Sequence, residues 1–172
     1  ITARQWYKEG KFGEIFYTEA QYFHPVQDDS PLWYDETGKK TWRYGRPPML
    51  YPTHSIALLV GVTGERLTEV SCLGWNDGTA VYKDNQYNNP YGCEVALFKT
   101  DRDHPFRVAE FRRGAVRGCE RADWYGQKMS YFMPHPNGLG PIVVQPEERA
   151  ETDDAGFEHR EARAVPYEQP DH

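Results

Sequence analysis

Apolar and polar side chains alternate with a period of two along several short segments rich in β-branched and aromatic residues. In one of them, Val70 and Cys72 alternate with Glu69 and Ser71. Such alternation is typical of a half-buried strand, and several such segments in a row indicate a largely antiparallel sheet with one face on a core. The pattern predicts strands at residues 12–24, 68–75, 93–99, 106–113, 116–125 and 128–133.

Only two segments are compatible with helices. Residues 1–9 form one, followed by Gly10 as a C-terminal cap, and residues 54–62 form the other, with Thr53 as N-cap and Gly61 or Gly64 at the end. We therefore expect an α+β domain over residues 1–144, with one open, mostly antiparallel sheet of about six strands and helices on one face. Its other face must be solvated or meet a second subunit, and we expect a two-fold dimer.

Charge separates the chain into two parts. Residues 1–144 carry 17 acidic and 17 basic side chains, whereas residues 145–172 carry nine acidic and three basic ones and thus the whole net charge of -6. The acidic segment 145–172 has few large apolar residues and is predicted to be an extended or disordered tail. A neutral body with an acidic tail argues against nucleic acid as a partner.

The sequence also gives no sign of a membrane span or of disulfide bonds. The longest aliphatic run, residues 56–60, is far shorter than the roughly 20 residues of a membrane span. Cys72, Cys93 and Cys119 are odd in number and widely spaced, so we expect reduced, buried thiols and, as a mild preference, a cytoplasmic location.

A proline-rich loop, residues 25–50, connects the first strand to the second helix. It is long for a plain connection, and long ordered loops are often functional, although its aromatic side chains could equally cover one edge of the core. Those aromatic residues are Trp33, Tyr34, Trp42 and Tyr44.

His54 is the candidate for chemistry because it lies in the first turn of a helix, directly after this loop. The partial positive charge of a helix N-terminus disfavours imidazolium, and a neutral ring can accept a proton from a substrate hydroxyl. A first-turn histidine that only makes local hydrogen bonds is the alternative. His104, His159 and His172 are expected to be solvated, and no histidine spacing supports a metal site.

Several segments resemble the C-terminal domain of oxidoreductases of the Gfo/Idh/MocA family. They are residues 9–17 running into 19–22, residues 67–73, the turn 89–91 and residues 123–126. The resemblance covers about residues 1–144. It implies an open-sheet domain that shapes a substrate pocket and a subunit interface.

The same resemblance implies that a Rossmann domain, with the cofactor site and the family's catalytic lysine, lies outside this chain. Two further observations agree with a fragment of a longer protein. The chain opens at Ile1 within a helix-compatible segment, and no glycine-rich dinucleotide fingerprint is present.

One family motif, Asp-x-Gly-x-His, matches only in part. His54 corresponds to the family histidine, but Leu50 stands at the aspartate position and Pro52 at the inner glycine. Loss of this carboxylate puts ordinary alcohol dehydrogenation in doubt, though not sugar binding. The Tyr-Pro-Thr-His sequence is also similar to relatives that cleave glycosides through a transient NAD-dependent oxidation.

The resemblance therefore implies the substrate-binding and dimerisation domain of an NAD- or NADP-dependent oxidoreductase acting on a sugar or polyol. Alternatives are a redox-assisted glycoside hydrolase and a non-catalytic sugar-binding or dimerisation module. The fragment alone is expected to bind neither cofactor nor metal. The expected site comprises His54 as the catalytic residue and His24, Trp42, Arg43, Tyr44 and Tyr51 as substrate-binding residues on one concave surface.

Overall fold

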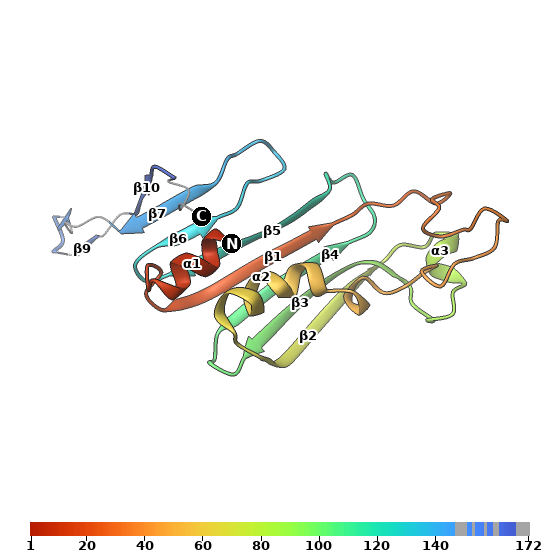
Figure 1. The fold of residues 1–172 in the computed structure, drawn as a ribbon, viewed down its shortest axis with the longest axis horizontal. Coiled ribbons are helices and arrows are strands. Elements are labelled where there is room, and N and C mark those ends of the chain that lie inside the picture. The colour runs from red at the N-terminus through yellow and green to blue at the C-terminus, as the bar shows by residue number, and fades with distance from the viewer. Residues whose placement is uncertain (147–150, 153, 157, 160–161, 168–172) are drawn as a thin grey trace.

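A single open sheet of eight strands dominates the computed structural model, which describes residues 1–146, 151–152, 154–156, 158–159 and 162–167. The strand order is β10-β7-β6-β5-β1-β4-β3-β2, and helices α1 and α2 lie against one face (Figure 1). The strands are β1 (Ile15–Phe23), β2 (Leu67–Asn76), β3 (Tyr91–Thr100), β4 (Pro105–Phe111), β5 (Cys119–Gly126), β6 (Ser130–Phe132), β7 (Ile142–Pro146) and β10 (Ala162–Val165), while β8 (Glu151–Thr152) and β9 (Glu158–His159) pair separately. The helices are α1 (Thr2–Lys8), α2 (Thr53–Thr63), α3 (Ala80–Lys83) and the 3₁₀ helix η1 (Pro48–Leu50).

This architecture confirms the predicted fold class. The sheet has eight strands rather than about six, because β7 and β10 extend it beyond β6. Strand β10 belongs to the acidic segment 145–172, and Tyr167 just after it stacks on Tyr131 of β6 at 6.0 Å between ring centroids. The strand pairs of this sheet are antiparallel except for β1 and β4, which run parallel.

The main core lies between the sheet and the two helices. Leu59 of α2 is completely buried against Phe106 and Val108 of β4, and Trp124 of β5 donates a hydrogen bond from Nε1 to the carbonyl of Leu58 at 3.1 Å. A second, smaller core joins the loop 25–50 to α3 beyond the end of the sheet (Figure 1). It contains Val26, Trp33, Tyr44, Val81 and Tyr82.

The start of α2 differs from the prediction, while its end agrees with it. Thr53 is the first helical residue, and Pro52 occupies the N-cap position, where no side chain caps the helix. A threonine that is already part of the first helical turn cannot occupy the N-cap position, which precedes that turn. At the other end Gly64 adopts a left-handed conformation (φ 75°), and its N–H bonds the carbonyl of Val60, so Gly64 rather than Gly61 ends the helix.

The prediction that His104 is solvated is wrong. Its ring is buried, with Nε2 2.9 Å from Thr18 Oγ1 and Nδ1 3.1 Å from Glu65 Oε2. The turn that contains His104 folds back onto β1, and burial lowers the pKa of the imidazole against the opposing effect of Glu65. His159 and His172 lie outside the side chains that the structure describes.

The three cysteines are free, but the prediction that all are buried is wrong. Cys72 is exposed because β2 is the edge strand of the sheet, with only β3 beside it. Cys93 and Cys119 are half-buried in β3 and β5.

The sheet face opposite α2 exposes apolar side chains on its outer strands. Along β3, Glu94 and Ala96 are buried on the helix side, so Val95 and Leu97 point to the opposite face. The register of β2 places Leu73 beside Val95, and Leu73 is 81% exposed. The part of this face formed by Leu73, Trp75, Val95 and Leu97 is called the β2–β3 patch below.

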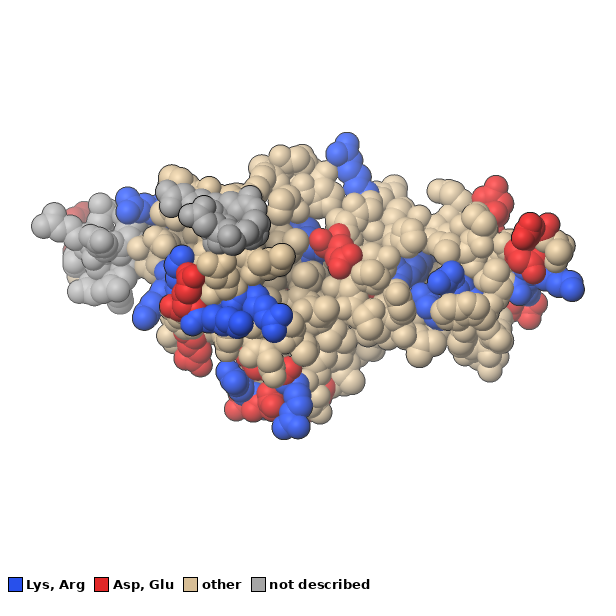
Figure 2. All heavy atoms as spheres, viewed as in Figure 1, with Lys and Arg blue, Asp and Glu red and all other residues tan. Residues whose placement is uncertain are grey.

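Charged side chains of both signs are scattered over the visible surface of the molecule (Figure 2). A group of Lys and Arg side chains gathers between α2 and the loop region that carries α3, where the main sheet ends (Figure 2). Within the described residues, no helix has the length and apolar composition needed to cross a membrane.

Candidate functional site

The parallel pair β1 and β4 creates the site, because the carboxyl ends of both strands reach the same edge of the sheet. Phe23 at the end of β1 lies beside Phe111 at the end of β4. His24 and Arg112 therefore leave the sheet side by side. The N–H of His24 bonds the carbonyl of Phe111 at 2.8 Å, and this hydrogen bond continues the ladder into the loop.

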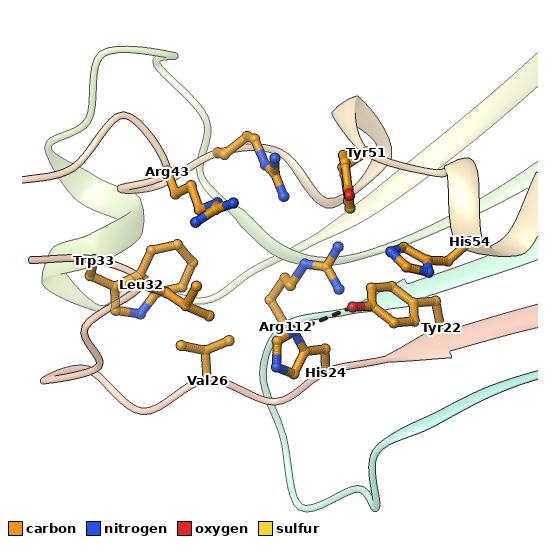
Figure 3. A pocket seen from close by; sticks show the side chains of 10 residues that line it. Tyr22, His24, Val26, Leu32, Trp33, Arg43, Tyr51, His54 and Arg112 are labelled. Atoms are coloured by element: carbon orange, nitrogen blue, oxygen red, sulfur yellow. Dashed lines mark hydrogen bonds between the residues drawn. The ribbon is translucent and has the colours of Figure 1, made fainter.

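A cavity of about 170 Å³ opens at this edge, between the sheet, the N-terminus of α2 and the loop 25–50. Figure 3 shows the labelled side chains pointing into it from these three elements. The cavity is lined by Tyr22, His24, Val26, Leu32, Trp33, Arg43, Arg46, Tyr51, His54 and Arg112.

His54 is held from two sides. Its ring stacks on Tyr22 with 4.3 Å between centroids and 13° between planes, and its Nδ1 lies 3.0 Å from Oε2 of Glu120 on β5. A neutral His54 that donates from Nδ1 to Glu120 keeps Nε2 as a proton acceptor. The ring thus has a fixed orientation at the wall of the cavity.

Three arginines line the cavity, each stacked on an aromatic ring. The guanidinium carbon of Arg46 lies 4.5 Å from the ring of Tyr51, and that of Arg112 lies 4.6 Å from the ring of Tyr22. Arg43 stacks on Trp42 at 4.8 Å. Burial together with the charges of Arg112 and Arg43 lowers the pKa of Arg46 from its usual value, and burial together with Arg112 and His54 lowers that of His24.

A buried acid lies behind the cavity. Glu110 on β4 is fully buried, accepts a hydrogen bond from Ser55 Oγ at 2.5 Å, and approaches Arg112 at 3.6 Å between Oε2 and Nη2. Burial raises the pKa of Glu110 to about 7, against the opposing effects of Ser55 and Arg112. Near neutral pH, Glu110 therefore offsets the charge of Arg112 only in part.

Four of the six residues named from the sequence meet at this cavity. His24, Arg43, Tyr51 and His54 line it, from the end of β1, the loop, the end of η1 and the first turn of α2. Trp42 does not line it. Its indole is largely exposed and stacks behind Arg43 and Arg46, and its carbonyl accepts a hydrogen bond from Tyr87 Oη.

Tyr44 also lies away from the cavity. It is buried in the smaller core, beside Tyr34 and under the ammonium group of Lys40, which is 4.3 Å from the ring centroid. Its position supports the interpretation that some loop aromatics cover a core.

Sequence reasoning missed four polar groups at or beside the site. Tyr22, Arg46 and Arg112 line the cavity, and Glu120 holds His54. Tyr22 and Arg112 reach the site through the parallel register of β1 and β4, which no local pattern reveals. The adjacent pair Arg112 and Arg113 at a strand end was the one available signal.

The cavity is smaller than a typical ligand pocket, and the described residues bring no set of metal ligands together. Its volume is below the roughly 300–1,000 Å³ of pockets for drug-sized ligands. No helix of the described chain opens from a glycine-rich turn that could hold a pyrophosphate. Across the part of the chain that the structure describes, no three His, Cys, Asp or Glu side chains come together as metal ligands.

Comparison with family models gives no match, nor does comparison with curated proteins. Solved structures do match. A levoglucosan dehydrogenase in complex with NADH aligns over 95% of this chain and 42% of its own, with a TM-score of 0.65 and 16% identity. A UDP-N-acetylglucosamine 3-dehydrogenase from Acidithiobacillus ferrooxidans aligns over 99% of this chain and 46% of its own, with a TM-score of 0.56 and 15% identity.

A scyllo-inositol dehydrogenase from Lactobacillus casei aligns over 92% of this chain and 41% of its own, with a TM-score of 0.55 and 15% identity. The chain thus spans less than half the length of each of these structures. The similarity confirms the fold that the Gfo/Idh/MocA resemblance implies, an open sheet with helices on one face.

Proposed function

We propose that residues 1–144 form the substrate-binding and dimerisation domain of an NAD- or NADP-dependent oxidoreductase that acts on a sugar or polyol. The observation that carries the proposal is the oriented His54, stacked on Tyr22 and bonded to Glu120, at a cavity in a fold shared with sugar and polyol dehydrogenases. The free cysteines favour a reducing, cytoplasmic location.

His54 has the geometry of a general acid–base group. With Nδ1 donating to Glu120, Nε2 can accept the proton of a substrate hydroxyl as the carbon that bears it is oxidised. The Glu120 carboxylate then stabilises the imidazolium that forms. His24 and Tyr51, on either side of His54 in the cavity wall, are assigned to binding and orienting the remaining hydroxyls.

Glu120 also supplies a carboxylate beside His54, where the family motif would supply an aspartate. Leu50 stands at the aspartate position of the motif, and its side chain is exposed on η1 rather than in the cavity wall. A carboxylate is nevertheless present beside the histidine, supplied by β5. This replacement favours a catalytic domain over a non-catalytic module.

We assign NAD or NADP to a Rossmann domain that this chain does not supply, because no helix of the described residues opens from a glycine-rich turn that could hold a pyrophosphate. When bound, the cofactor supplies the hydride acceptor. Residues of this chain have a separate task, which is to bind the sugar and to hold its proton at His54.

Product analysis tests the function. The full-length protein is incubated with NAD or NADP and a panel of sugars, polyols and aryl glycosides. An oxidised sugar formed in step with reduced cofactor supports the proposal. Glycoside cleavage without net cofactor reduction would point to a redox-assisted hydrolase, and no conversion with any compound would point to a binding module.

The proposed dimer interface is the β2–β3 patch, because a large exposed apolar area on a sheet face is typical of an interaction surface. We expect the double variant Leu73→Asp, Leu97→Asp to shift the protein from dimer to monomer in size-exclusion chromatography with light scattering. Loss of two buried leucines and repulsion across the two-fold axis should weaken association roughly 100-fold or more.

Leu139→Asp is the matched control, because Leu139 is comparably exposed but lies in the loop after β6, away from the patch. This variant should remain dimeric. A wild-type chain that is monomeric at all accessible concentrations would contradict the assignment.

A further inference from the structure

The cavity at His54 is cationic, and its charge is more than a neutral sugar requires. Arg43, Arg46 and Arg112 line it, and no Asp or Glu is among the lining residues. Two carboxylates of the described residues contact side chains of the wall. Glu120 is engaged by His54, and Glu110 is fully buried behind Arg112 with a pKa raised to about 7 by burial. The cavity thus presents an excess of positive charge to a ligand.

The strongest sign of a missing partner is Arg112. This residue is only 4% exposed, yet its buried Nη1 finds no hydrogen-bond partner within the part of the chain that the structure describes. Its nearest acid, Glu110, is 3.6 Å away, beyond hydrogen-bond distance. A buried guanidinium without full pairing is costly, and Arg112 lines the cavity, so an anion bound there would stabilise its charge.

Stacking leaves the arginines available to a ligand. Each of the three guanidinium groups has one planar face against an aromatic ring: Arg43 on Trp42, Arg46 on Tyr51 and Arg112 on Tyr22. The N–H groups project from the edges of the guanidinium plane, where they bind carboxylate or phosphate oxygens in pairs. Figure 3 shows Arg43 and Arg112 directed into the same space from opposite walls.

We infer that the substrate is a monosaccharide bearing a carboxylate or phosphate group, which these arginines bind while His54 addresses a ring hydroxyl. This inference rests on the proposed function and specifies its substrate class. The cavity of about 170 Å³ suits a small anion rather than the phosphates of a whole dinucleotide.

Calorimetric titration of the 172-residue chain at low ionic strength tests the inference. The probes are d-glucuronate, glucose 6-phosphate and glucose 1-phosphate, with d-glucose as the neutral counterpart and acetate and inorganic phosphate as simple anions. We expect at least one acidic sugar to bind about tenfold or more tightly than glucose, because a charge-assisted pair outweighs neutral hydrogen bonds. The uronate and the phosphates together show which anionic group is preferred.

Arg43→Gln and Arg46→Gln should each weaken binding of the acidic sugar about tenfold and weaken binding of glucose by a smaller factor, because only the acidic sugar loses a charge-assisted pair. Both side chains are on the loop, so these variants keep the buried Arg112 in place. Arg66→Gln is the matched control, since Arg66 is exposed and pairs with Asp101 beyond the other end of α2. It should bind as the wild type does.

The outcomes separate the inference from the proposed function. Glucose binding as tightly as the acidic sugars, with no effect of the loop arginines, would overturn the inference and leave the sugar function standing. Simple anions binding as tightly as the acidic sugars would support the anion site and contradict the sugar function. Binding of none of these compounds would overturn both.

Discussion

Replacement of His54 by alanine in the full-length enzyme is expected to lower kcat about 10²–10⁴-fold, the usual contribution of an acid–base group. KM should change little, because substrate binding is assigned chiefly to other groups of the cavity. Stability should also change little, because the half-buried imidazole loses only its stacking on Tyr22 and one hydrogen bond to the exposed Glu120. Steady-state kinetics and thermal unfolding of the same preparation check both parts.

Two further variants test the role assigned to His54. Glu120→Gln retains an acceptor for Nδ1 but removes the charge that stabilises imidazolium, so its kcat should fall less than that of His54→Ala. His135→Ala is the control, because His135 is exposed in the turn after β6 and is not among the residues that line the cavity at His54. Unchanged activity of His54→Ala with a sharply lower melting temperature would mean that His54 is structural.

Glu110→Gln is expected to change how stability depends on pH. The pKa of Glu110 is raised from 4.5 in the unfolded chain to about 7 in the folded protein, so the folded state disfavours the ionised form. As pH rises from 5 to 8, the unfolded carboxyl ionises first, and the free energy of unfolding should fall by about 2–3 kcal/mol from this group alone. In Glu110→Gln that component of the fall should be absent.

Urea unfolding at pH 5 and pH 8 measures the effect. Glu36→Gln is the matched control, because Glu36 is exposed in the loop 25–50, and its variant should retain the wild-type dependence on pH. An equal change in the free energy of unfolding between pH 5 and pH 8 for wild type and Glu110→Gln would show that burial does not raise the pKa of this carboxyl.

The sheet could be predicted from the sequence because its signal is local. Each of the six predicted strands is present within three residues of its expected bounds, since the period-2 alternation of a strand is visible within one short segment. Strand β10 was missed because Ala162–Val165 is short and lies within an acidic, apolar-poor segment. Its pairing with β7 depends on tertiary contact, which composition does not reveal.

The site was predictable only where a local pattern or a family motif marked a residue. His54 lies in the first turn of a helix and matches a motif, and Arg43 and Tyr51 precede it in the chain. Arg112 and Glu120 lie 58 and 66 residues after His54 and approach it only through the order of strands β4, β1 and β5. The sequence does not distinguish Tyr44, which is in a core, from Tyr51, which is in the cavity wall, because both lie in a turn-rich region without a regular period.

The proposed function depends most directly on whether a sugar binds beside His54. Side-chain NMR of the histidine rings in the 172-residue chain, recorded as d-glucose and d-glucuronate are added in turn, reports this at the atoms concerned. We expect saturable shifts of the His54 and His24 signals with at least one sugar, while the signals of the buried His104, which is held by Thr18 and Glu65, stay unchanged. Saturable shifts of other histidine signals but not of His54 and His24, or no shift at millimolar sugar, would contradict sugar binding at this site.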